Sequence, residues 1–149
     1  MQPEHVARRL KEFEAICRRR GLPLTVQRRL ILQTVLESDD HPAAEQVLES
    51  VRQRVPGVSR TTVYRVLDTL VDLGVIRRLH HPGATVRFDG RTCRHHHLIC
   101  KVCNHVADFE SAKLDRIALP DVQSLGFQID DFSVQFIGTC AACRQGDAP

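Results

Sequence analysis

Apolar residues repeat at helical spacing throughout the first half of the chain. Val6, Leu10 and Phe13 recur every three or four positions with charged residues between them, which is the pattern of an amphipathic helix. The same period predicts four helices in this half, over residues 3–20, 26–37, 43–54 and 60–73. Thr25 and Ser59 stand immediately before two of these segments and are predicted N-caps.

The pattern changes after Gly74, where two short apolar runs follow. Residues 75–79 and 84–88 flank the turn His80-His81-Pro82-Gly83, so we expect a β-hairpin. Helices followed by a hairpin in this order predict a winged helix, which is a helix-turn-helix variant. The two histidines of the wing tip are expected to face solvent rather than bind metal.

The second half of the chain is less helical. The pattern predicts two strands, over residues 95–99 and 104–109, and a longer strand over 127–139. Between them it predicts a short helix over 111–119, which could continue towards Leu125. Such a small unit buries little core and would benefit from a structural metal and from pairing with a second copy. The predicted fold is therefore α+β. It consists of a winged-helix DNA-binding domain over 1–88, a hinge near 86–94, and a small α/β dimerisation domain over 95–149.

The composition is that of an ordinary globular protein, with 42% hydrophobic and 26% charged residues. No apolar run approaches the ~18 residues of a membrane span, and the first residues lack the apolar core of a secretory signal. We therefore expect a cytoplasmic protein without a membrane partner. In that compartment, six cysteines favour metal binding or redox chemistry over a disulfide framework.

Charge is unevenly distributed along the chain. Residues 1–90 carry 15 Lys and Arg against 11 Asp and Glu, whereas residues 91–149 carry 6 against 7. This mild excess fits a polyanionic partner and fits an ordinary solvated surface equally well. A predicted helix beside a wing is more specific, because its exposed side chains can reach phosphates and base edges in the major groove. The candidate DNA contacts are Arg60, Thr61, Tyr64 and Arg65 on that helix, with Arg28 and Arg77 for the backbone.

Two C-x-x-C motifs each follow a predicted strand. Two turns that each present two thiolates form a closed tetrahedral shell, which predicts a structural Zn²⁺ site at Cys100, Cys103, Cys140 and Cys143. The competing interpretation is a pair of thioredoxin-type redox centres, which is disfavoured because neither motif is predicted to open a helix. Cys17 lies on the apolar face of the first helix and is interpreted as a small core residue.

A second group of potential ligands surrounds the first C-x-x-C motif. Residues i and i+2 of a strand face the same side, so His95 and His97 converge while His96 points away. With the carboxylates of Asp89 and Asp108, they make a site suited to Fe²⁺ or Mn²⁺, and Zn²⁺ also fits. A solvated polar loop is the alternative interpretation.

These motifs, in this order, resemble the ferric uptake regulator family of metalloregulators. The resemblance covers nearly the whole chain, from about residue 5 to residue 143. It rests on LTVQRRLIL at 24–32, His41-Pro42-Ala43, SRTTVYRVLDTLVDLGVI at 59–76, RFD at 87–89, HHHLICKVCNHVADF at 95–109 and IGTCAAC at 137–143. It implies a homodimeric transcriptional repressor, not an enzyme, that binds double-stranded operator DNA when it carries metal.

The resemblance also assigns ligands residue by residue. The four cysteines of the two motifs match the structural zinc ligands. The regulatory metal ligands are matched by His41, Asp89, His95, His97 and Asp108. His41 does not stand out by spacing, since it reads as a loop residue before a helix. Because it belongs to the DNA-reading half, one shared ion would tie the two halves together and set the separation of the two recognition helices in a dimer.

Aspartates at both 89 and 108 resemble the peroxide-sensing branch of the family, because the iron-sensing branch more often has glutamate there. In that branch, Fe²⁺ with peroxide oxidises a ligand histidine, here His41 or His95, whereas Mn²⁺ supports DNA binding and responds poorly to peroxide. An iron- or zinc-uptake regulator is the alternative. Cys93 is interpreted as a spare loop thiol, although zinc-sensing relatives use a cysteine nearby. Asp131-Phe132-Ser133 stands where some relatives have histidines of a third site, so no third site is expected.

Two other classes of protein fit the sequence less well. A metalloenzyme built on the His/Asp group would need an open coordination position and a substrate pocket. The sequence supplies no separate general base, phosphate loop or nucleophile arrangement to accompany them. A metal storage or delivery protein would have no need for a winged helix.

Overall fold

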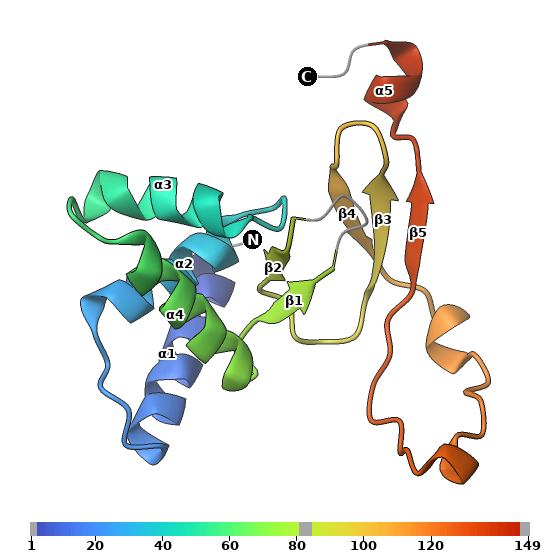
Figure 1. Cartoon of the computed structure of the whole chain (residues 1–149), viewed down its shortest axis with the longest axis horizontal. Helices are drawn as coiled ribbons and strands as arrows, with labels where there is room; N and C mark the ends of the chain where they lie inside the picture. The colour runs from blue at the N-terminus through green and yellow to red at the C-terminus, as the bar shows by residue number, and fades with distance from the viewer. Residues whose placement is uncertain (1–2, 81–84, 147–149) are drawn as a thin grey trace. The chain divides into compact units, whose positions relative to one another are not determined.

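The computed structural model describes residues 3–80 and 85–146 (Figure 1). The chain divides into two compact units, Met1–Thr92 and Cys93–Pro149. Among the described residues, the first unit holds four α-helices and a two-stranded sheet, and the second holds a three-stranded sheet with short helical segments. The predicted α+β class is confirmed.

The helices of the first unit are α1 (Pro3–Arg19), α2 (Val26–Glu37), α3 (Ala44–Arg54) and α4 (Arg60–Asp72), each within a residue of its predicted bounds. Both predicted N-caps form. Thr25 Oγ1 accepts a hydrogen bond from the Arg28 N–H at 3.2 Å, and Ser59 Oγ accepts one from the Thr62 N–H at 3.0 Å. These bonds satisfy donors that the first turn of a helix cannot use internally.

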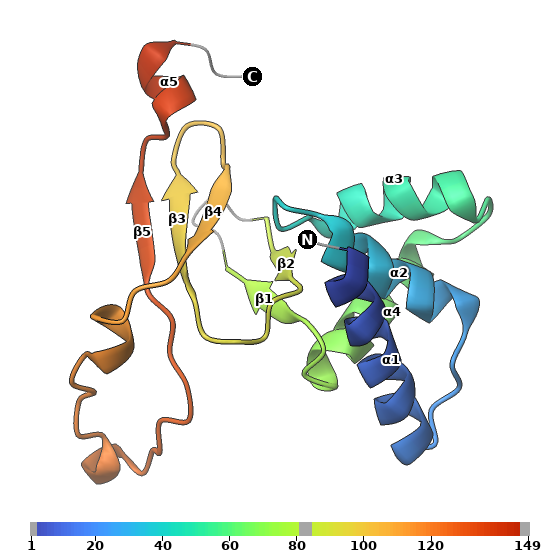
Figure 2. The ribbon, with the colours of Figure 1, turned by 180° about the vertical axis from the view of Figure 1, so that it is seen from behind.

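The core of the first unit forms where the apolar faces of the helices meet. In that unit α2 packs against α1, α3 and α4 (Figure 2). Phe13, Ile31 and Leu67 are almost completely buried there, as is Cys17, which is 1% exposed. Burial raises the pKa of the Cys17 thiol. Its predicted role as a small core residue is confirmed.

The predicted hairpin is present but shorter than expected. Strands β1 (Arg77–Leu79) and β2 (Arg87–Asp89) pair antiparallel. Residues 75 and 76 were predicted to lie in the first strand. Instead they belong to the turn after α4, where the N–H groups of Val75 and Ile76 both donate to the Leu70 carbonyl and the two side chains join the core. His80 is exposed, as predicted, and His81 lies outside the described residues.

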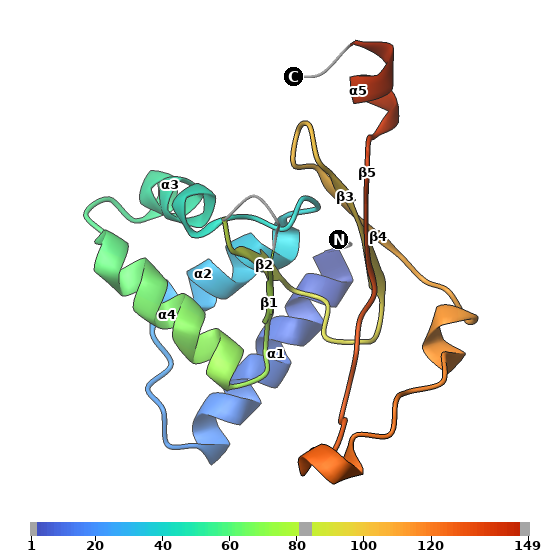
Figure 3. The same ribbon diagram turned by 45° about the vertical axis from the view of Figure 1, so that its right-hand side comes forward.

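The sheet of the second unit has the strand order β4-β3-β5 (Figure 1) and is seen nearly edge-on in Figure 3. Strand β3 (His96–Cys100) is central. It pairs antiparallel with β4 (Val106–Phe109) and parallel with β5 (Gln135–Gly138). The prediction of a strand over 127–139 is wrong for most of its length. Strand β5 pairs only opposite 97–100, because β3 starts at His96 and offers no partner further back.

The predicted helix over 111–119 is also wrong. The connection from β4 to β5 contains only two single turns of 3₁₀ helix, Leu114–Arg116 and Gln123–Leu125, and no residue of either turn is buried. Forming the first turn of a helix costs conformational entropy, and a short helix without a buried apolar face has no packing energy to offset that cost. Gly126, with φ of +72°, ends the second turn.

Within the described residues, no helix combines the length and the apolar character needed to cross a bilayer.

Candidate metal centres and nucleic-acid surface

The four cysteines of the two C-x-x-C motifs lie together at one end of the second unit's sheet. Their sulfur atoms all lie within 4.8 Å of one another. Cys100 Sγ is 3.7 Å from Cys143 Sγ, and Cys103 Sγ is 3.7 Å from Cys140 Sγ. Four thiolates about 2.3 Å from a tetrahedral Zn²⁺ ion lie roughly 3.8 Å from one another. The donor set and its spacing therefore fit a zinc ion.

Strand pairing explains how sulfurs so distant in sequence meet. Cys100 is the last residue of β3 and lies opposite Gly138 of β5, so the chain leaving β5 arrives beside it. The turn after Cys100 closes through Asn104, whose N–H donates to the Cys100 carbonyl at 3.0 Å. Asn104 has a φ of +62°, a left-handed conformation that asparagine tolerates better than most residues.

Backbone amides stabilise one thiolate of the group. N–H groups of Cys103 and Cys140 lower the pKa of the Cys100 thiol to about 5, and the latter amide donates to Cys100 Sγ at 3.4 Å. Loss of hydration raises the pKa of Cys143, with further contributions from the neighbouring cysteines. Because a thiolate is the form that binds metal, Cys100 is ready to act as a ligand at neutral pH.

The prediction that neither C-x-x-C motif opens a helix is wrong. Cys140 is the N-cap of α5 (Ala141–Gln145), so the second C-x-x-C motif does open a helix. The helix has only five residues, which is too short for apolar residues to repeat at helical spacing, so the sequence pattern did not predict it. The sulfur contacts at 3.7 Å nevertheless join the two motifs to each other. That geometry favours one shared four-sulfur shell over two separate redox dithiols.

The second unit also gathers two imidazoles and a carboxylate. His97 of β3 lies opposite Asp108 of β4. The Nε2 atoms of His95 and His97 are each 3.5 Å from Asp108 Oδ1, and the two ring centroids are 4.6 Å apart. His95 Nδ1 lies 2.9 Å from the Cys93 carbonyl, a contact that directs Nε2 towards Asp108.

His96 turns to the opposite side, as the strand alternation predicts. Its ring is fully buried, and its Nδ1 accepts a hydrogen bond from the Val134 N–H at 3.2 Å. Its Nε2 lies 3.3 Å from Asp115 Oδ1. These contacts join β3 to the connection that precedes β5, which gives His96 a structural role.

The first unit holds a smaller group of the same chemistry. His41 Nε2 lies 3.7 Å from Asp89 Oδ1, and both side chains are buried. Asp89 Oδ1 also accepts a hydrogen bond from the Arg91 N–H at 2.7 Å. His41 lies in the loop before α3 and has no periodic or spacing signal of its own, so only the family resemblance identifies it.

The exposed face of α4 carries the predicted DNA contacts. Arg60, Thr61, Tyr64 and Arg65 are all exposed. The Tyr64 hydroxyl donates to the Glu45 carboxylate of α3, which raises the pKa of the phenol and lowers that of the carboxyl group.

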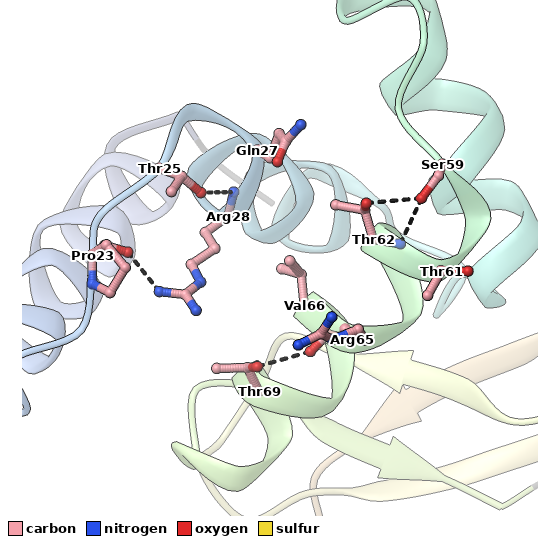
Figure 4. Close-up of a pocket in the computed structure, with 10 residues that line it drawn as sticks. All are labelled: Pro23, Thr25, Gln27, Arg28, Ser59, Thr61, Thr62, Arg65, Val66 and Thr69. Carbon is pink, nitrogen blue, oxygen red and sulfur yellow. Dashed lines mark hydrogen bonds between the residues drawn. The ribbon is translucent and has the colours of Figure 1, made fainter.

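A groove of about 290 Å³ lies between the start of α2 and α4. Figure 4 shows Arg28 reaching from α2 and Arg65 from α4 into this groove, which Thr25 and Ser59 also line. Two guanidinium groups beside two capped helix N-termini make an environment suited to phosphate. One nitrogen of the Arg28 guanidinium is already hydrogen-bonded within the protein, because Nη1 donates to the Pro23 carbonyl at 2.6 Å.

The wing arginines differ in their surroundings. Arg77 of β1 is half-buried and lies opposite Asp89, whereas Arg78 is exposed. Arg78 Nη2 forms an ion pair with Asp68 Oδ1 at 2.6 Å, so it braces β1 against α4. The structure therefore makes the predicted backbone contact at Arg77 less accessible than the contacts on α4.

The sequence model of the ferric uptake regulator family matches residues 19–137. The chain belongs to the ferric uptake regulator family. A curated relative, the peroxide-responsive repressor PerR of Staphylococcus epidermidis, is 29% identical over 147 residues, with 95% of each chain covered. The solved ferric uptake regulator of Francisella tularensis with iron is 28% identical, with a TM-score of 0.70 over 83% of this chain and 96% of that one.

The fold is shared still more closely with a more distant protein of the family. The Helicobacter pylori ferric uptake regulator superposes with a TM-score of 0.78 and covers 93% of both chains, at 20% identity. That likeness confirms the architecture predicted from the sequence, with an N-terminal helical domain followed by an α/β domain. Membership places the chain among metal-responsive regulators.

Proposed function

We propose that this protein is a metal-dependent transcriptional repressor whose affinity for operator DNA is set by one Fe²⁺ or Mn²⁺ ion. The proposed ligands are His41, Asp89, His95, His97 and Asp108. The observation that carries the proposal is the division of buried imidazole and carboxylate groups between the two units. Mn²⁺ favours octahedral coordination, which neither the pair in the first unit nor the trio in the second can fill alone.

This division supplies a switch. An ion that needs ligands from both units stabilises only those arrangements in which the units present them together. In a homodimer, the two recognition helices must be about one turn of DNA apart to enter successive major grooves. Metal occupancy would thereby favour the spacing that fits the operator.

The second unit supports the proposed homodimer. Strand β5 is an edge of its sheet, and all four of its residues are exposed. Phe136 and Ile137 are 46% and 57% exposed. An open sheet edge with large apolar side chains is unfavourable in water, so we assign it to contact with a second copy.

We assign a structural Zn²⁺ ion to the four cysteines. The sulfur spacing and the pKa of Cys100 support this assignment. Such an ion contributes folding free energy to the second unit, which has few fully buried side chains. It has no open coordination position and thus no catalytic role.

Within the family, we favour the peroxide-responsive branch. The support is the pair of aspartates at 89 and 108 and the similarity to a peroxide-responsive repressor. Fe²⁺, when bound, would supply the redox chemistry by which peroxide oxidises His41 or His95. An iron- or zinc-uptake regulator is the second candidate.

The test begins with duplexes that the Mn²⁺-loaded, zinc-replete protein selects from a random-sequence pool. Retardation of those duplexes at fixed salt should require Mn²⁺ or Fe²⁺ and vanish with a chelator that spares the zinc. Peroxide should then release the DNA from the iron form but not from the manganese form. It should also add 16 mass units to the His41 or His95 peptide. Selection of no duplex would overturn the repressor proposal, and an iron form indifferent to peroxide would move the protein to the second candidate.

A further inference from the structure

The loop that carries His41 is fastened along β2. The Phe88 N–H donates to the Pro42 carbonyl at 3.0 Å, and Ala43 pairs with Arg87 as an isolated antiparallel bridge. Figures 1 and 2 show this loop, between α2 and α3, beside β2. These backbone contacts hold the loop from residue 42 onwards but do not reach the peptide groups that flank His41.

The Arg87 side chain binds that remaining part. Arg87 Nη1 donates to the Asp40 carbonyl at 2.8 Å and to the His41 carbonyl at 3.1 Å. The Arg87 side chain is only 13% exposed, and Nη1 is also 3.8 Å from the Asp40 carboxylate. One guanidinium nitrogen thus binds two successive carbonyl groups, and hydrogen bonds from a charged donor are stronger than those between neutral groups.

The backbone conformation at His41 is unfavourable and needs contacts that hold it in place. Its φ is +45°, in the left-handed region that a side chain with a Cβ disfavours. It also precedes Pro42, which restricts the preceding residue towards extended conformations. Among the described residues, the other non-glycine with positive φ is Asn104, whose side chain tolerates that region well. Conformations of this kind persist when the surrounding contacts hold them in place.

We propose that Arg87 is a positioning residue that holds His41 in its left-handed conformation and thereby prepares the first unit's share of the regulatory metal site. The inference rests on the proposed function. Asp89 follows Arg87 by two residues on β2, so the strand that carries the brace also carries the carboxylate 3.7 Å from the His41 ring. The metal would then find an imidazole and a carboxylate already oriented, with less ordering to be done on binding.

The experiment uses the full-length, zinc-loaded protein and Mn²⁺ as the probe. Arg87→Met removes both hydrogen bonds but keeps most of the packing, and it should weaken Mn²⁺ affinity about tenfold or more, measured by calorimetry. Arg87→Lys should restore most of that affinity, because an ammonium group can donate to both carbonyls. Electron spin-echo spectra should show one histidine nitrogen fewer on the Mn²⁺ of Arg87→Met than on that of the unmodified protein.

A matched control lies in the same unit. Arg52 Nε also donates to a backbone carbonyl, that of Val58, at 3.3 Å. Arg52→Met therefore removes an arginine-to-carbonyl bond without touching the His41 loop. It should change Mn²⁺ affinity less than twofold, even if both methionine variants lower the melting temperature equally.

The outcomes separate the two proposals. If the unmodified protein binds no Mn²⁺, or if His41→Ala binds it as tightly, the proposed function fails and this inference with it. If His41 is required but Arg87→Met binds Mn²⁺ within twofold of the unmodified protein, only the role of Arg87 is overturned. Should Arg87→Met not fold, Arg87→Gln decides the matter. Its amide NH2 keeps donor hydrogens on a shorter, uncharged side chain and should weaken binding to an intermediate extent; unchanged affinity refutes the inference.

Discussion

The two groups of metal-ligand residues are built in opposite ways. The cysteine group lies within one unit, at the ends of paired strands, with sulfur contacts of 3.7 Å across its two motifs. The His/Asp residues are divided between two units, and His41 has an unfavourable backbone conformation. A site confined to one unit suits permanent occupancy, whereas a divided one suits exchange, because its affinity depends on how the units are arranged.

The largest expected effect comes from breaking the cysteine group. Cys100→Ser should abolish stoichiometric zinc binding and unfold the second unit, because structural zinc contributes on the order of 10 kcal/mol of folding free energy. The first unit has a separate core and should keep its helices. Zinc analysis with two-dimensional NMR would measure both effects. Cys93→Ser is the control and should retain zinc, and a folded second unit in Cys100→Ser would contradict the assignment.

Breaking the His/Asp group should have a different signature. Asp108→Ala removes the carboxylate that both His95 and His97 approach at 3.5 Å. Mn²⁺ affinity should fall on the order of 100-fold, with zinc content and the melting temperature of the Mn²⁺-free protein nearly unchanged. His105→Ala, an exposed histidine near the same strand, serves as the control. A matching loss of zinc would show that the two sites are not independent.

The DNA surface offers a smaller effect. Arg65→Ala on the groove of Figure 4 should weaken operator binding by about 1–3 kcal/mol. If Arg65 contacts a phosphate, the slope of log affinity against log salt should also fall by about one. Arg19→Ala, at the exposed end of α1, should leave affinity and slope unchanged. Equal effects of both variants would assign binding to net charge rather than to α4.

The smallest effect concerns pH. In zinc-free protein the pKa of Cys100 is lowered to about 5 from its ordinary value of 9.0. A lowered folded-state pKa means that this thiolate's contribution is complete above pH 9 and is lost as pH falls through 5. Cys143, with its raised pKa, opposes folding as pH rises above 9. Because the second unit folds only with zinc, this dependence should appear as zinc retention, which is complete near neutral pH and is lost as pH falls towards 5. Zinc analysis after equilibration at stepped pH measures it, and Cys93→Ser should give the same profile.

Sequence patterns predicted the parts of this fold that bury an apolar face. Helices α1 to α4 have regular stripes, and the hydroxyls of Thr25 and Ser59 mark where two of them begin. No residue of the two 3₁₀ turns in the connection over 110–134 is buried. Without an apolar face to bury, the helix predicted there does not form. Helix α5 is too short to show a period.

The same distinction applies to the candidate sites. Fixed spacing identified the four cysteines and the alternation of His95 and His97, because strands and turns impose that spacing. His41 depends on a left-handed backbone and on a side chain 46 residues later in the chain, Arg87. No local pattern encodes such a contact, which is why only the family resemblance identified His41.

The parallel pairing of β3 with β5 has a consequence for biosynthesis. The first unit can acquire its structure as soon as its helices emerge from the ribosome, since most of their contacts are local. The four-cysteine group instead joins Cys100 to a sulfur 43 residues further on. The cysteine group of a newly made second unit therefore cannot close until Cys143 has been translated. If zinc closes it as proposed, a cell short of zinc would accumulate chains with a folded first unit and an unfolded second unit.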